Sequence, residues 1–103
     1  MLDSNTLDIL KKTSKFYFPK EEYQVFIFGS WAKGTNQKSS DIDIGIIPKK
    51  TLNIDKKNAF QSCLENSEIP YLNDIVDFNT VSKQFKKNAI KKIINIKYFL
   101  YHM

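Results

Sequence analysis

The sequence contains no arginine, and its sixteen basic residues are all lysines. The planar guanidinium fork that grips a phosphate through two parallel hydrogen bonds is therefore excluded. Any polyphosphate ligand has to be held by backbone amides, metal ions and lysine ammonium groups. The formal net charge of +5 is compatible with a nucleic-acid surface. However, most paired lysines fall on predicted helices, where a solvated polar face is the ordinary explanation.

Cysteine and long apolar runs are also scarce. Cys63 is the single cysteine, so a disulfide framework is excluded. No apolar run approaches the roughly 18 residues that a membrane span needs, and the first residues do not resemble a secretion signal. We therefore expect a cytoplasmic protein without membrane contact. A chain of 103 residues predicts a single domain over 1–103, too small to carry a separate substrate-recognition module.

Helical and strand patterns alternate along the chain. Apolar residues at helical spacing predict helices over 4–15, 53–66 and 80–94. The candidate inward positions are Leu7, Ile9 and Leu10 in the first helix, and Ile54, Ala59 or Phe60, and Leu64 in the second. The aromatic and β-branched segments 23–28, 41–47 and 73–78 predict strands. The apolar segment 94–103 is typical of a short edge strand or of a partner-binding segment. This alternation indicates an α/β (α+β) domain with a small sheet covered on its faces.

Two aspartates open the second predicted strand. Asp41 and Asp43 are two residues apart, so their side chains point to the same face and repel each other unless a cation lies between them. Hard cations with oxygen ligands, Mg²⁺ above all, suit such a pair. If the 73–78 strand lies alongside, Asp77 can complete a three-aspartate cluster for two-metal phosphoryl chemistry. Asp74 is on the face opposite to Asp77, and we expect it to end the preceding loop.

A glycine and a serine end the first predicted strand. Gly29 allows the backbone to turn sharply and a phosphate to approach, and Ser30 offers a hydroxyl and an amide at the start of a helical turn. Lys33 supplies a cation nearby. We call Gly29 and Ser30 the phosphate clamp.

Structural explanations compete with these assignments. Asp41 alone could cap a turn after Ser40, but its pairing with Asp43 and the clamp upstream favour a ligand role. Trp31 could stack on a base, although packing or partner contact is the more common role of such a residue. The aromatic run Phe16 to Phe18 is expected to belong to the core.

The spaced string Gly29-Ser30-x-Ala32-x-Gly34, five further residues, Ser40-Asp41-x-Asp43, and Asp77 about thirty residues later resembles the signature of the DNA polymerase β-like nucleotidyltransferase superfamily. The likeness spans nearly the whole chain and is nearest to the minimal nucleotidyltransferase domains. It implies a small mixed β-sheet of three to four strands flanked by about four helices. The chain departs from the family pattern at Lys33, which stands where an arginine is usual.

The resemblance also implies a function. Minimal nucleotidyltransferase domains are usually antitoxins paired with a HEPN-domain toxin, and some transfer AMP from ATP to a tyrosine of that toxin. Carried over, Gly29, Ser30, Lys33 and Ser40 would bind the nucleotide. Asp41 and Asp43 would ligate Mg²⁺, with Asp77 as third ligand or base. The expected partners are ATP and a HEPN toxin, in a possible homo- or hetero-oligomer.

Two other functions stay open from the sequence. The chain could neutralise its partner by forming a complex without catalysis, since eight of the eleven residues 93–103 are apolar or aromatic. Nucleotide addition to RNA or DNA ranks lowest, because the chain has no accessory nucleic-acid domain and nucleic acid is not the expected partner.

Overall fold

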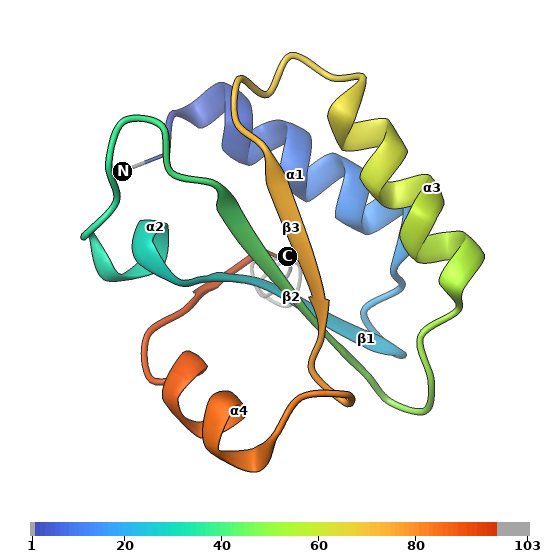
Figure 1. The fold of residues 1–103 in the computed structure, drawn as a ribbon. Helices are drawn as coiled ribbons and strands as arrows, with labels where there is room; N and C mark the ends of the chain where they lie inside the picture. Colours follow the sequence, from blue (N-terminus) through green and yellow to red (C-terminus); the bar gives the residue numbers. More distant parts are fainter. Residues whose placement is uncertain (1, 97–103) are drawn as a thin grey trace.

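A computed structural model describes residues 2–96 of the chain (Figure 1). Within this range the elements are α1 (Ser4–Tyr17), β1 (Tyr23–Phe28), α2 (Ser30–Lys33), β2 (Ile42–Pro48), α3 (Ile54–Glu65), β3 (Asn73–Asp77), α4 (Lys83–Ala89) and β4 (Ile94–Asn95). None of the described helices is both long and apolar enough to cross a membrane.

The strands form one mixed sheet in the order β3-β2-β1-β4. Strand β1 pairs antiparallel with β2 and with β4, whereas β2 and β3 run parallel. A parallel pair needs a crossover connection, and α3 supplies it. The predicted small mixed sheet flanked by helices is confirmed.

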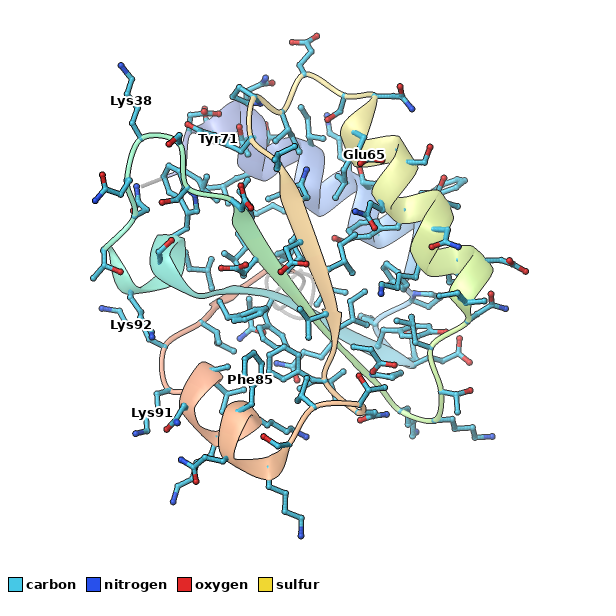
Figure 2. The ribbon with its side chains drawn as sticks, viewed as in Figure 1. Lys38, Glu65, Tyr71, Phe85, Lys91 and Lys92 are labelled. Atoms are coloured by element: carbon cyan, nitrogen blue, oxygen red, sulfur yellow. The ribbon has the colours of Figure 1, made fainter. Side chains whose placement is uncertain are left out.

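Side chains alternate between the two faces of the sheet, as strand geometry requires. On one face, Phe26, Phe28 and Phe78 form a buried aromatic cluster, against which Val81 and Ala89 from the α4 region are partly buried. Phe85 of α4 points toward the sheet at this cluster (Figure 2). Gly45 lies so close to these rings that a Cβ at its position would overlap Phe26 and Phe78.

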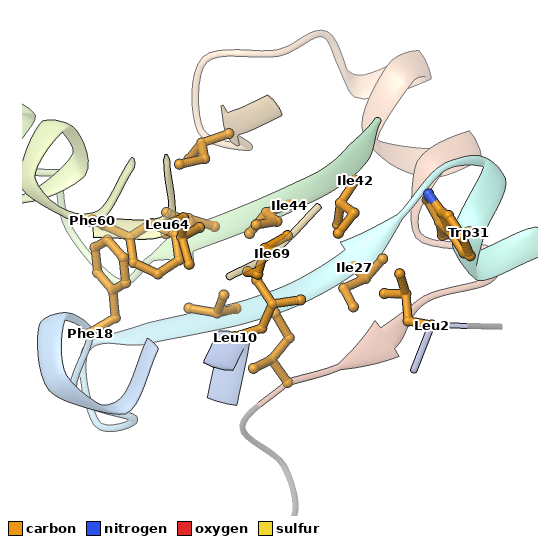
Figure 3. Packing of buried hydrophobic residues seen from close by; sticks show 14 residues of the cluster. Leu2, Leu10, Phe18, Ile27, Trp31, Ile42, Ile44, Phe60, Leu64 and Ile69 are labelled. Carbon is orange, nitrogen blue, oxygen red and sulfur yellow. The ribbon is translucent and has the colours of Figure 1, made fainter. Parts of the chain in front are cut away.

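The opposite face carries the larger core. Its central residues are Ile27 of β1 and Ile42 and Ile44 of β2, and helices α1 and α3 cover them with Leu10, Phe60 and Leu64 (Figure 3). The two helices lie side by side on this side of the sheet (Figure 1). Leu10, Phe60 and Leu64, three of the inward positions predicted for these helices, are therefore confirmed. The inward position predicted for Ile54 was wrong, because this residue begins α3 and is 61% exposed.

Some sequence expectations were wrong in detail. Phe16 is 80% exposed although it was expected in the core, because α1 continues to Tyr17 and turns that side chain to solvent. The third long helix is shorter than predicted, since Ser82 caps it and Ile90 ends it, and none of its residues is fully buried. Of the apolar C-terminal segment, Ile94 and Asn95 form the edge strand β4, while 97–103 lie outside the described residues.

The aromatic residues that end α1 allow a direct stability test. Phe18 is fully buried and packs edge-on against Phe60 with ring centroids 4.9 Å apart, whereas Phe16 is mostly exposed. We expect Phe18→Ala to lower the free energy of unfolding by about 3–5 kcal/mol. The matched Phe16→Ala change should stay within about 0.5 kcal/mol of the parent. Urea denaturation measures both, and equal losses would contradict the packing described.

Candidate functional site

The turn between β1 and α2 depends on a residue without a side chain. Gly29 has φ +74° and ψ −153°, a region of backbone conformation that is essentially restricted to glycine. A Cβ at this position would also overlap the Asp43 carboxylate, with Oδ2 as the nearest atom. Glycine is therefore required here for its backbone conformation and for space.

Helix α2 starts immediately after this turn. The first hydrogen bond of the helix runs from the Lys33 N–H to the Gly29 carbonyl, at 3.0 Å. The N–H groups of the three preceding residues have no partner within the helix, as is general for a first helical turn. Ser30 is half-buried and Lys33 exposed, so neither is sealed inside the core. Free amides and a hydroxyl at this bend suit an anion.

The loop that joins α2 to β2 is fixed by Ser40 and Trp31. The indole Nε1 of Trp31 donates to the Ser40 carbonyl at 2.9 Å, and the Gln37 N–H donates to the Ser40 hydroxyl at 2.7 Å. Trp31 is buried and packs edge-on against Tyr71, with ring centroids 5.0 Å apart. Packing is thus the role of Trp31 here. Ser40 has a structural role, and its predicted contact with a nucleotide stays a prediction.

Three aspartates, Asp41, Asp43 and Asp74, lie near one another at the beginning of β2 and β3. Asp43 is half-buried beside Gly29. In the register of the parallel strands β2 and β3 it lies opposite Asp74, that is, level with it along the strands. Residues that are level in adjacent strands project to the same face. Burial first, then the negative charges of Asp74 and Asp41, raises the pKa of the Asp43 carboxyl above its ordinary value. The carboxylates are therefore close enough to repel one another.

Asp77 does not belong to this group, and its predicted place in the cluster was wrong. It lies level with Ile46, three residues beyond the Asp43–Asp74 level, which is about 10 Å along the strand. Its side chain also points to the opposite face, the one shared by Ile75. There the Asp77 carboxylate accepts a hydrogen bond from the Asn79 N–H at 2.9 Å. Its role is to close the turn after β3.

The residue missed by the sequence analysis is Asp74. The signal was present in the alternation of β3, since Ile75 shares its face with the buried isoleucines of β2, and Asp43 occupies the opposite face. An acidic partner of Asp43 therefore has to alternate with Ile75. Asp74 meets that condition, and Asp77 does not.

The donor set at this site fits Mg²⁺ in one particular way. Within residues 2–96, no three acidic, histidine or cysteine side chains lie close enough to hold an ion among themselves. Mg²⁺ is usually held by one or two carboxylates together with substrate phosphates rather than by a complete protein cage. Asp41 and Asp43 offer hard oxygen donors beside the phosphate clamp. They would hold the ion jointly with a bound nucleotide.

Gly29→Ala tests the clamp. The added methyl group meets the Asp43 carboxylate and leaves the backbone strained at positive φ. We expect the variant to lose Mg²⁺-dependent nucleotide binding and to unfold at a lower temperature than the parent. Gly34→Ala is the matched control, because Gly34 also has positive φ (+77°) but has nothing within 4 Å of an added Cβ. Its cost should be about 1–2 kcal/mol, the usual penalty for a residue with a Cβ in the left-handed conformation, with binding retained. Equal binding loss in both variants would contradict this account.

Asp43→Asn tests the crowding of negative charge. The folded state raises the pKa of the Asp43 carboxyl. This group therefore contributes most to the free energy of unfolding when the pH is below about 3.8, the ordinary pKa of an aspartate, and that contribution is lost as the pH rises. In EDTA, the variant should therefore melt a few degrees above the parent at pH 7. The difference should shrink as the pH falls toward 4. Asp77→Asn makes the same chemical change outside the cluster and is measured alongside as the control. A variant that melts below the parent at pH 7 would refute the electrostatic explanation.

Comparison with known proteins identifies the family of this chain. The family model described as polymerase beta, nucleotidyltransferase matches residues 10–98. A probable protein adenylyltransferase MntA from Haemophilus influenzae is 30% identical over 92 residues, which cover 89% of this chain and 78% of that protein.

Two solved structures are similar in fold. One is a toxin–antitoxin with AMP-PNP, with a TM-score of 0.70 and 23% identity over 87% of this chain and 71% of that one. The other is tri-AMPylated Shewanella oneidensis HEPN toxin in complex with MNT antitoxin, with a TM-score of 0.67 and 19% identity over 92% and 71%. These two support the fold, and the match over residues 10–98 supports the family. The chain belongs to the polymerase β nucleotidyltransferase family.

Proposed function

We propose that this chain is an Mg²⁺-dependent adenylyltransferase that acts as an antitoxin by transferring AMP from ATP to a hydroxyl group of a HEPN-type partner toxin. The observation that carries the proposal is the packing of the Asp43 carboxylate against Gly29, at the bend where α2 presents its unpaired amides. That arrangement puts an anion site next to a carboxylate pair. The similarity to a probable protein adenylyltransferase supports AMP as the transferred group.

Each residue of the candidate site has a separate role in the proposed reaction. The phosphate clamp holds the triphosphate, and exposed Lys33 adds positive charge at the end of α2. Asp41 and Asp43 hold Mg²⁺, which when bound neutralises phosphate charge and lowers the pKa of the attacking hydroxyl. Asp74 replaces Asp77 as the third carboxylate, because it is level with Asp43 and exposed to an incoming acceptor. We assign to Asp74 the acceptance of the proton from the acceptor hydroxyl.

The chemical step balances without any further reactant. The acceptor oxygen forms a bond to the α-phosphorus of ATP, and the bond from that phosphorus to the bridging oxygen of the β-phosphate breaks. The electron pair leaves with pyrophosphate, and the hydroxyl proton goes to the Asp74 carboxylate. Tyrosine is the acceptor that we propose, and a solved structure of similar fold is described as containing an AMPylated toxin.

Labelling with ATP that carries the label on its α-phosphate tests the reaction. With Mg²⁺ and the HEPN-type protein encoded beside this chain, the parent should label the partner. Asp43→Asn should lower the labelling rate about 100-fold or more, because several kcal/mol of charge stabilisation are lost. Asp74→Asn should cause a loss of about 100-fold, within the range for removal of a general base.

Asp77→Asn is the matched control for this experiment. It makes the same chemical change on the same strand but at the other face, so labelling should stay within a few-fold of the parent. If Asp77→Asn abolishes labelling and Asp74→Asn does not, the assignment of Asp74 is wrong. If the parent does not label an authentic partner, the adenylyltransferase proposal fails.

Neutralisation by complex formation alone is the second candidate. It was motivated by the apolar segment 93–103, of which Ile94 and Asn95 pair with β1 and Ile96 is buried. This part of the segment therefore serves the fold, and residues 97–103 lie outside the described range. An Asp43→Asn chain that still neutralises the toxin fully would favour complex formation over catalysis.

A further inference from the structure

The segment from α4 to β4 carries a concentration of positive charge. Five lysines fall within residues 83–92, and no aspartate or glutamate follows Asp77 anywhere in the sequence. Four of these lysines are exposed and one is half-buried; the five are Lys83, Lys86, Lys87, Lys91 and Lys92. The segment itself therefore contains no acidic residue to offset the charge of these lysines.

Apolar side chains are exposed among these lysines. Phe85 is 43% exposed and Ile90 is 42% exposed, although α4 is the helix that covers this face of the sheet. We call the surface formed by Phe85, Ile90, Lys91 and Lys92 the α4 surface. Lys91 and Lys92 project from the turn that follows α4, while Phe85 points toward the sheet (Figure 2). An apolar patch edged by lysines suits a partner with both acidic and apolar side chains.

The α4 surface adjoins the candidate site through a single aromatic ring. Phe85 packs edge-on against Phe28, with ring centroids 6.1 Å apart. Phe28 directly precedes Gly29 and is level with Asp43 in the antiparallel pair. The α4 surface therefore lies on the same face of the sheet as the Asp43 carboxylate, at which a hydroxyl would react in the proposed function.

We propose that the α4 surface docks an acidic segment of the acceptor protein, with an apolar side chain of that segment seated against Phe85 and Ile90. This inference rests on the proposed function, since it supplies the docking site for its protein substrate. Charge complementarity selects an acidic partner. A protein segment is favoured over nucleic acid because Ile90 offers an aliphatic contact, and because the ring of Phe85 points toward the sheet and packs against Phe28 rather than presenting a stacking platform.

The double variant Lys91→Glu/Lys92→Glu tests this docking. Binding of the purified HEPN-type protein is measured by calorimetry at low and physiological salt, and binding of a fluorescent ATP analogue with Mg²⁺ is measured in parallel. We expect acceptor binding at least about tenfold weaker, because like charges then face each other, with nucleotide affinity unchanged. Parent binding should weaken as salt rises, and this dependence should be smaller in the variant.

The matched control is Lys12→Glu/Lys15→Glu. It makes the same change of charge at two exposed lysines of α1, the helix that packs on the opposite face of the sheet. Its acceptor affinity should stay within twofold of the parent. Ile90→Ser tests the apolar contact separately and should weaken acceptor binding severalfold without changing its salt dependence.

Three results would overturn the proposal. Acceptor binding that is unchanged in the double variant would place the docking surface elsewhere. Nucleotide affinity that falls by the same factor would assign the lysines to the triphosphate. Single-stranded RNA that binds the parent more tightly than the acceptor does, and is lost in the double variant, would make this a nucleic-acid surface. Because these are binding measurements, an inactive parent would refute the proposed function while leaving the docking result interpretable.

Discussion

The candidate site depends on the contact between Gly29 and the Asp43 carboxylate. The two residues end β1 and begin β2, and the antiparallel pairing of those strands brings their ends together. Only a residue without a side chain fits, because the carboxylate fills the space in which a Cβ would lie. The same glycine takes a positive φ at the turn where the chain passes from β1 into α2. One atomic contact thus joins the anion site to the acidic site.

The distribution of charge follows from that contact. Burial first, and then the neighbouring charges of Asp74 and Asp41, raises the pKa of Asp43, so the folded chain holds this negative charge at some cost in stability. Functional sites commonly carry strain of this kind, and a bound cation relieves it. Positive charge is gathered instead on α4 and the turn that follows it. In the two proposals, nucleotide and acceptor are therefore held by separate surfaces. Phe28 lies between them, because it precedes Gly29 and contacts Phe85.

The absence of arginine shapes both surfaces. A lysine offers a compact charge without a fixed hydrogen-bonding geometry. In the proposed function, precise placement of a phosphate therefore falls to the backbone at Gly29 and Ser30 and to a metal ion that Asp41 and Asp43 would hold. The lysines of the α4 surface can attract an acidic segment, but its apolar residues have to fix the position. Rigid backbone and packed rings supply the geometry that the charged side chains cannot.

The local sequence pattern was sufficient to predict the helices and strands. It failed where the position of a residue depends on packing against distant parts of the chain. The spans of β1 and α3 were predicted closely, because apolar spacing and the residues that cap each element are local properties. The exposure of Phe16 was missed, since a run of three aromatics does not reveal which member faces solvent at the end of a helix. The length of α4 was missed because Val81 and Ile93 continue an apolar pattern beyond the residues that are helical.

The sequence by itself determined the clamp, the Asp41 and Asp43 pair and the family, because those depend on the identity and spacing of residues within one continuous stretch. Alternation along β3 was also sufficient to separate Asp74 from Asp77 once Ile75 is assigned to the core face. Only the tertiary structure decided that Asp74 is level with Asp43. The register of two parallel strands is set by how the crossover through α3 packs against the sheet, and no local pattern encodes that distance.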